Sequence, residues 1–136
     1  FTNWSDDGVE YKFHLGTDAA VQVVRDLDKV WSDQDWEGVR GMLSDTAKFY
    51  WRNGNVFSVD EFMTQISSDS TGSATWKFNG AFSVDLDPTR GGEHVHADFS
   101  VSTKTDSTTV NRDVLERYYI IDGKVVTWHQ YSIDVK

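Results

Sequence analysis

The sequence predicts an α+β domain in which three helices cover one face of a curved β-sheet. In the first half of the chain, apolar residues recur at spacings of three and four, as in amphipathic helices. In the second half, apolar and polar residues alternate, as in strands with one buried face. Asp122-Gly123 lies between two such stretches and indicates a β-hairpin.

Three helices are expected before residue 70. Thr17 is a suitable N-cap for a helix of about five turns. Asp35 begins a second, shorter helix, and Ser58-Val59-Asp60-Glu61 is a capping box for a third. The first helix places its apolar residues inward, namely Ala20, Val23, Val24, Leu27, Val30 and Trp31. Residues 1–16 form an N-terminal arm, and residues 1–136 form a single domain.

A strand is expected at Ala47–Trp51, and four longer strands follow residue 73. Residues 74–86 place Trp76, Phe78, Phe82 and Val84 on one face, and residues 94–103 place Val95, Ala97, Phe99 and Val101 on one face. The last two strands are apolar on both faces. Their outer face is therefore expected to meet a second molecule of this chain.

The Asp-Gly turn predicts the register of the final hairpin. If Ile121 lies opposite Lys124 and pairing continues without interruption, Arg117 lies opposite Trp128. One face then carries Arg117, Tyr119, Trp128 and Gln130. The other face carries Glu116, Tyr118, His129 and Tyr131.

Composition excludes several classes of function. The net charge of -9 disfavours a nucleic-acid partner, which needs a basic surface. No apolar run is long enough to span a membrane. Cysteine is absent, which excludes thiol catalysis and thiolate metal sites. The chain begins at Phe1, so a leader was removed or the sequence was trimmed, and both a cytoplasmic and an exported protein remain open.

The segment DWEGVRGMLSDTAKFYWRNGN, a capped short helix, and a meander ending in DGKVVTWHQYS resemble the nuclear transport factor 2-like superfamily. The SnoaL-like and ketosteroid-isomerase-like branches are most similar, over roughly residues 17–134. The resemblance implies a cone-shaped, strongly bent mixed sheet that wraps around a pocket and is covered by three helices. Many members dimerise through the outer sheet face, which implies a homodimer here through Glu116, Tyr118, His129 and Tyr131.

The resemblance does not carry over the catalytic residues of the isomerase branch. Its carboxylate base falls at Trp51, its oxyanion-binding tyrosine near Leu27, and its second acidic residue near Arg117. Isomerase chemistry of that type needs a base within hydrogen-bond reach of the proton, and an indole is not one.

Two other branches fit no better. The dehydratase-like branch implies a histidine and an aspartate in the pocket, whereas His94, His96 and His129 are expected to face outward. The epoxide-hydrolase-like branch implies an arginine between two carboxylates. Arg117 fits that arginine, but Tyr119 stands where a carboxylate is needed.

The leading hypothesis is binding, with turnover as an open option, of a small hydrophobic molecule in the cone. Arg117 would bind its carboxylate or enolate oxygen, and Gln130 would add a polar contact. The expected walls are Trp51, Trp76, Trp128 and Tyr119. Alternatively, Arg117 is structural and bonded to a helix C-terminus or to an acidic side chain of the arm. Turnover would be a SnoaL-like cyclisation, isomerisation or dehydration, and no catalytic residue is assigned.

A different class of function also fits the sequence. A non-catalytic dimeric association module would have a cone filled by side chains. We expect no cofactor and no metal. A row of His96, Glu116 and His129 has zinc-ligand chemistry, but such rows are more often hydrogen-bonded decoration of a sheet face.

Overall fold

The computed structural model describes residues 2–4, 8–68, 74–86 and 90–135. Within them lie three helices, a two-stranded sheet and a seven-stranded sheet. No helix in these ranges is long and apolar enough to cross a membrane. In chain order the elements are β1 (Thr2–Trp4), β2 (Glu10–Lys12), β3 (His14–Leu15), α1 (Asp18–Ser32), α2 (Trp36–Gly41), β4 (Leu43–Tyr50), β5 (Val56–Phe57), α3 (Val59–Ser68), β6 (Ala74–Asp85), β7 (Glu93–Lys104), β8 (Thr109–Ile121) and β9 (Lys124–Val135).

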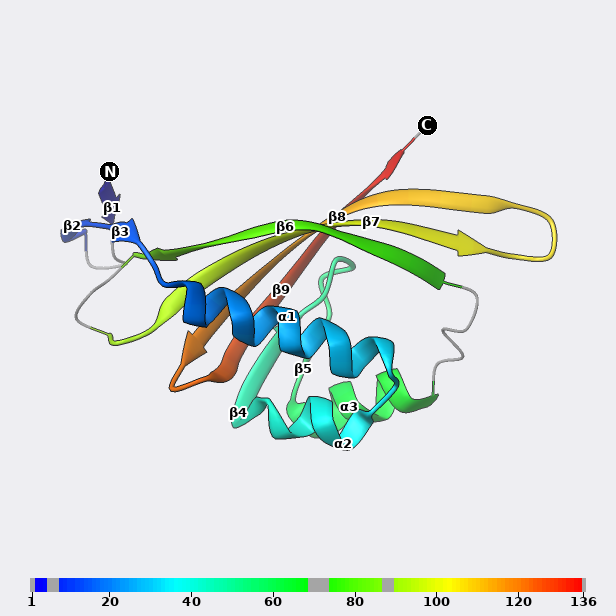
Figure 1. Ribbon diagram of the computed structural model, residues 1–136, viewed down its shortest axis with the longest axis horizontal. Coiled ribbons are helices and arrows are strands. Elements are labelled where there is room, and N and C mark those ends of the chain that lie inside the picture. Colours follow the sequence, from blue (N-terminus) through cyan, green and yellow to red (C-terminus); the bar gives the residue numbers. More distant parts are fainter. Residues whose placement is uncertain (1, 5–7, 69–73, 87–89, 136) are drawn as a thin grey trace.

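The large sheet has the order β3-β6-β7-β8-β9-β4-β5 and is mixed, because β4 runs parallel to β9 while the other neighbours are antiparallel. The long strands β6 to β9 form a curved layer, and α1, α2 and α3 all lie on the same side of it (Figure 1). This arrangement confirms the predicted α+β class with a bent mixed sheet and three covering helices. The smaller sheet pairs β1 with β2, and β3 joins the edge of the large sheet beside β6.

The first two helices begin at the residues that local sequence predicts. Thr17 Oγ1 accepts a hydrogen bond from Ala20 N at 3.2 Å, and Asp35 Oδ1 accepts one from Gly38 N at 2.9 Å. Each bond satisfies a backbone donor that the first turn leaves unpaired. Helix α1 has 15 residues, or about four turns rather than the five expected, because the chain turns at Gln34, which has a φ of 55°.

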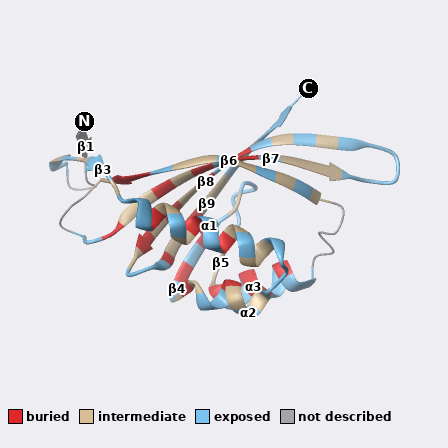
Figure 2. Cartoon of the chain, in the orientation of Figure 1, coloured by how far each residue is buried: buried red, intermediate tan, exposed pale blue. Residues whose placement is uncertain are grey.

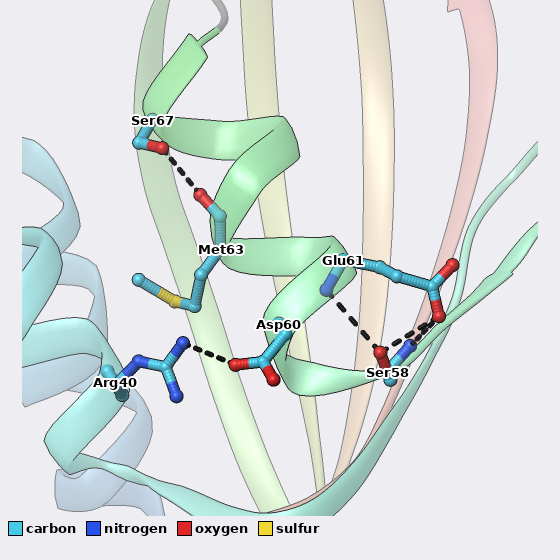
Figure 3. Close-up of polar contacts among 6 residues, drawn as sticks. All are labelled: Arg40, Ser58, Asp60, Glu61, Met63 and Ser67. Carbon is cyan, nitrogen blue, oxygen red and sulfur yellow. Dashed lines mark hydrogen bonds and ion pairs between the residues drawn. The ribbon is translucent and has the colours of Figure 1, made fainter.

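The predicted capping box of α3 is confirmed (Figure 3). Glu61 N donates to Ser58 Oγ at 3.4 Å, and Ser58 N donates to Glu61 Oε1 at 3.3 Å. In the same turn, Asp60 accepts a hydrogen bond from Arg40 of α2 at 2.7 Å. This ion pair links α2 to α3 but is exposed, so it adds little to stability.

The core lies between the concave side of the sheet and the inner faces of the helices (Figure 2). Phe49 of β4 stacks on Phe62 of α3, with ring centroids 3.8 Å apart, and neither exceeds 1% exposure. Trp128 of β9 lies 5.4 Å from Phe62 and 5.7 Å from Trp31 of α1, centroid to centroid. These rings form one aromatic cluster that joins α1, α3 and the sheet.

A β-bulge in β6 changes the face of one predicted core residue. The pairing with β7 shifts between Phe78 and Gly80, so Phe78 lies opposite Phe99 while Phe82 lies opposite His96. Because side chains alternate along a strand, one extra residue moves the following side chains to the other face. Phe82 is 53% exposed, and the prediction that it shares a face with Phe78 is wrong.

A second bulge overturns the predicted register of the hairpin. Ile120 pairs with Val125 as expected, but Tyr119 pairs with Thr127, which leaves Val126 as the extra residue. Arg117 therefore lies opposite His129, not Trp128. Glu116 and Tyr118 now share a face with Gln130 and Trp128, and Arg117 and Tyr119 lie on the opposite face.

Candidate functional site

A cavity of about 140 Å³ lies between α1 and the concave face of the long strands. Most of its lining side chains are aromatic or aliphatic; Asp28, Glu116 and Gln130 are the polar ones, and Tyr118 adds a hydroxyl. The lining residues are Leu27, Asp28, Trp31, Trp51, Trp76, Phe99, Val101, Val114, Glu116, Tyr118, Trp128 and Gln130. A concave, mostly apolar space with a few convergent polar groups is the usual form of a small-molecule site.

Glu116 is the most buried carboxyl of this lining, with 8% of its surface exposed. Its Oε1 accepts a hydrogen bond from Gln130 Nε2 at 2.9 Å, and its Oε2 accepts one from the Tyr118 hydroxyl. Burial raises the pKa of Glu116 above its ordinary value, and the two hydrogen bonds offset part of that rise. The nearby Asp28 also raises the pKa of Glu116.

Tyr118 stands beside Glu116 as a fixed hydrogen-bond donor. The residue is 2% exposed, and its ring packs on Trp128 with centroids 4.8 Å apart. Burial raises the pKa of Tyr118 well above its ordinary value, and the adjoining Glu116 carboxyl raises it further. Tyr118 therefore keeps its proton and donates a hydrogen bond to the carboxyl.

Asp28 reaches the cavity from α1. Its Oδ1 accepts a hydrogen bond from the Trp76 indole N–H of β6 at 2.9 Å, which links the helix to the sheet. A second hollow of about 440 Å³ adjoins the cavity and shares Asp28, Trp31 and Trp76 with it. The Asp28–Trp76 pair therefore lies at the boundary between the inner cavity and a more open space.

Two polar atoms of the lining residues are buried without a hydrogen-bond partner. They are Trp128 Nε1, a donor, and Gln130 Oε1, an acceptor. The Trp128 indole N–H lies near enough to Glu116 to lower the pKa of that carboxyl somewhat, but it makes no hydrogen bond of normal geometry. Buried polar groups are usually paired, so these two atoms mark a place that a ligand or water can complete.

Four of the six predicted ligand-binding residues line this cavity, namely Trp51, Trp76, Trp128 and Gln130. Arg117 and Tyr119 do not, because the bulge at Val126 turns them to the outer face. The predicted inward placement of Arg117 and Tyr119 is therefore wrong, and so is the outward placement of Glu116 and Tyr118.

A physical signal for the correct face was present in the sequence. An arginine cannot lose its charge in a protein, whereas a glutamate in an apolar site can take up a proton. Arg117 and Glu116 are neighbours on one strand, so only one of them can face the buried side. Burying the glutamate costs less free energy than burying the arginine. Asp28 had no comparable signal, because only the packing of α1 on β6 brings it to the cavity.

The outer face of the sheet gathers histidines around Arg117. Arg117 lies between His96 of β7 and His129 of β9. Burial, and next the charge of Arg117, lower the pKa of His96 and of His129. The pKa of His94 is lowered to about 4 by burial, by Arg117, and by the nearby His96, His129 and Arg90. Arg117, rather than Glu116, separates His96 from His129, so the considered His-Glu-His row does not form. The described residues contain no group of three metal-ligating side chains.

The histidine rings are held by stacking. His129 stacks on Tyr50 with ring centroids 4.3 Å apart, and His96 stacks on Phe82 at 4.9 Å. His94 packs against Tyr119 at 4.6 Å. A row of rings on either side of Arg117 therefore crosses the outer face.

No family model matches this chain, and no curated protein matches it at a significant level. Solved structures do match it in fold. An LEH-like epoxide hydrolase from M. tuberculosis has 15% identity and a TM-score of 0.69, with 86% of this chain and 84% of that chain covered. The structure of Bal32a from a soil-derived mobile gene cassette has 9% identity and a TM-score of 0.69, covering 84% and 88%.

A third structure carries the fold name itself. An NTF-2 like protein of unknown function from Burkholderia xenovorans LB400 has 12% identity and a TM-score of 0.64, with 87% of this chain and 85% of that chain covered. At sequence identities this low, the similarity establishes the fold but not an activity. The chain therefore has the nuclear transport factor 2-like cone fold.

Proposed function

We propose that this protein binds a small, largely apolar molecule in the cone cavity, with Glu116 as the central polar contact. The observation that carries the proposal is a buried carboxyl, held by Tyr118 and Gln130, at the wall of an otherwise apolar cavity. A carboxyl with a pKa raised by burial in a cavity is a frequent mark of a functional site. Proteins of this fold include one named as an epoxide hydrolase, which agrees with a cone that admits a small molecule.

The ligand is not expected to carry a carboxylate. That expectation rested on Arg117, which lies on the opposite face of the sheet. Within the described part of the chain, the cavity lining contains two carboxyl side chains and no Lys, Arg or His. An anionic ligand would meet like charge in a poorly solvated space, which is unfavourable.

The same carboxyl is the candidate acid or base if the ligand is turned over. General acid–base catalysis works best when the pKa of the group lies near the working pH, and burial moves Glu116 in that direction. Tyr118 would hold the carboxyl in place through its hydrogen bond. A SnoaL-like cyclisation, isomerisation or dehydration is the class of reaction that such a site would serve.

The proposal is tested by blocking the cavity. Val114 lines the cavity and is 5% exposed, whereas its neighbour Leu115 points to the outer face and is 39% exposed. Calorimetry with a small neutral alcohol should show binding to the wild type and to Leu115→Phe, and loss of binding in Val114→Phe. Equal binding by Val114→Phe, or no binding by the wild type to a panel of such alcohols, would overturn the proposal.

A second candidate function is association through the outer sheet face. Towards the end of β9 this face exposes several large apolar side chains, namely Leu115 (39%), Tyr131 (50%), Ile133 (68%) and Val135 (48%). We propose that a second copy of the chain covers them, since exposed apolar surface of this kind is typical of interfaces. Glu116 and Tyr118, which were expected in this interface, face the cavity instead. The cavity itself argues against a cone filled by side chains.

A further inference from the structure

We propose that the ligand of the cone cavity is a small organic cation, an amine or quaternary ammonium compound, held between carboxyl groups and tryptophan faces. This inference rests on the proposed function, because it names the chemical class of the molecule that the cavity binds. It follows from the charge, the aromatic content and the unpaired polar atoms of the lining.

The charge of the cavity is not balanced from within the protein. Asp28 is hydrogen-bonded to the neutral Trp76 indole, and Glu116 to the neutral Tyr118 hydroxyl and Gln130 amide. The residues that line the cavity in the described part of the chain include no cationic side chain. A ligand ammonium group would supply the missing positive charge, and the low dielectric of the site would strengthen that attraction.

The aromatic lining is suited to a cation. Four of the six tryptophans of the chain reach this one cavity, namely Trp31, Trp51, Trp76 and Trp128. The π face of an indole carries negative potential and attracts ammonium groups more strongly than phenyl or phenol faces do. Quaternary ammonium ligands are typically recognised by several such rings around one charge.

The unpaired polar atoms indicate what else the ligand carries. Trp128 is 4% exposed, and its indole N–H makes no hydrogen bond of normal geometry, although it lies near the Glu116 carboxyl, while Gln130 Oε1 has no donor. A ligand hydroxyl can accept from the first atom and donate to the second. The carbonyl dipole of Gln130 also favours positive charge. Choline, which combines a trimethylammonium group with a hydroxyl, is therefore the appropriate probe.

The test compares choline with the neutral alcohol in which a carbon atom replaces its nitrogen. The two molecules have the same shape and differ in charge. Calorimetry, with tryptophan fluorescence as a second readout, should show that choline binds about tenfold more tightly, as expected from a desolvated cation–π contact. Equal affinities would overturn the cation assignment and leave the proposed function standing. Failure of both probes to bind would overturn the cation assignment, and the wider alcohol panel described above would then decide the proposed function.

Variants locate the source of the preference. Asp28→Asn and Glu116→Gln each remove an ionisable carboxyl at nearly constant shape, and each should lower the choline-to-alcohol affinity ratio toward one. Asp26→Asn is the matched control, because Asp26 lies on the same helix, is exposed and does not line the cavity. A ratio unchanged in Asp28→Asn and Glu116→Gln would contradict the assignment. If Glu116→Gln does not fold, Asp28→Asn carries the test alone.

Discussion

The hydroxyl of Tyr118 donates a hydrogen bond to the carboxyl of Glu116, which lies two residues earlier on the same strand and the same face. Gln130 of the neighbouring strand completes the carboxyl from the other side at 2.9 Å. This triad places an ionisable group inside the protein with neutral donors as its partners. The stability of the fold should therefore depend on the protonation of Glu116, and the donors should govern the pKa of that group.

Glu116→Gln should stabilise the protein at alkaline pH. The folded-state pKa of Glu116 is raised, so the folded protein holds this proton more tightly than the unfolded chain does. The contribution of Glu116 to stability is thus fully present below its unfolded pKa of 4.5 and is lost as pH rises through the folded pKa. The variant lacks this loss, and Gln130 can turn its unpaired Oε1 toward the new amide.

Thermal unfolding of the wild type and Glu116→Gln at about pH 4 and about pH 8 measures the effect. The advantage of the variant should be small at the acidic pH and larger at the alkaline pH, because only the wild type must keep a buried carboxylate there. His94, His96 and His129 titrate in both proteins and cancel in the difference. An advantage that is the same at both pH values would contradict the buried, elevated pKa of Glu116.

Tyr118→Phe should raise the pKa of Glu116 further. The Tyr118 hydroxyl stabilises the ionised carboxylate, and its removal leaves burial less opposed. Carbon-detected NMR titration of the glutamate carboxyls should show the Glu116 midpoint moving to higher pH. Tyr119→Phe removes the same hydroxyl one residue along, on the outer face, and should leave that midpoint in place. A downward move in Tyr118→Phe would mean that the hydroxyl does not serve the carboxylate.

Phe62 of α3 and Phe82 of β6 should differ sharply in their contribution to stability. Phe62 is 1% exposed and stacks on Phe49, so Phe62→Ala should cost about 3–5 kcal/mol of unfolding free energy. Phe82 is 53% exposed beyond the bulge in β6, so Phe82→Ala should cost about 1 kcal/mol or less. Urea denaturation measures both. A loss at Phe82 as large as at Phe62 would show that another molecule buries Phe82 or that the bulge is absent.

Features set by neighbouring residues could be predicted from the sequence. Thr17, Asp35 and the Ser58–Glu61 box begin their helices where expected, because a cap depends on a side chain and the backbone within three residues. The order of helices and strands followed from the period of the apolar residues. These signals are local and need no knowledge of the rest of the fold.

The faces of the long strands could not be predicted in the same way. Both faces of β8 carry apolar residues. One face has Val114, Glu116, Tyr118 and Ile120, and the other has Leu115, Arg117, Tyr119 and Ile121. An uninterrupted register from the Asp-Gly turn predicts that Arg117 and Tyr119 face inward. The extra residue Val126 shifts the pairing by one, so that Glu116 and Tyr118 face inward instead. Bulges are set by the curvature of the whole sheet, which no local pattern reveals.

The sequence predicted three of the tryptophans that line the cavity. Trp51, Trp76 and Trp128 do line the cavity, although a ligand-binding role for them is still a prediction. The acidic members, Asp28 and Glu116, were not found. Their proximity depends on how α1 crosses β6 and on the register of β8, and both are long-range features.

Tyr131→Asp or Ile133→Glu should shift the protein from dimer to monomer. Both side chains are at least 50% exposed on the outer face in the single chain, and a second copy would bury them and meet the new charge in an apolar contact. Gln65→Glu adds the same charge on the exposed side of α3 and should leave the dimer intact. Light scattering over a range of concentrations measures the mass of each. Glu116→Lys, by contrast, should damage folding rather than association, because Glu116 faces the cavity. If the wild type stays monomeric at high concentration, the outer face is not a self-association surface, because its exposed apolar side chains are then stable in water without a second copy to cover them.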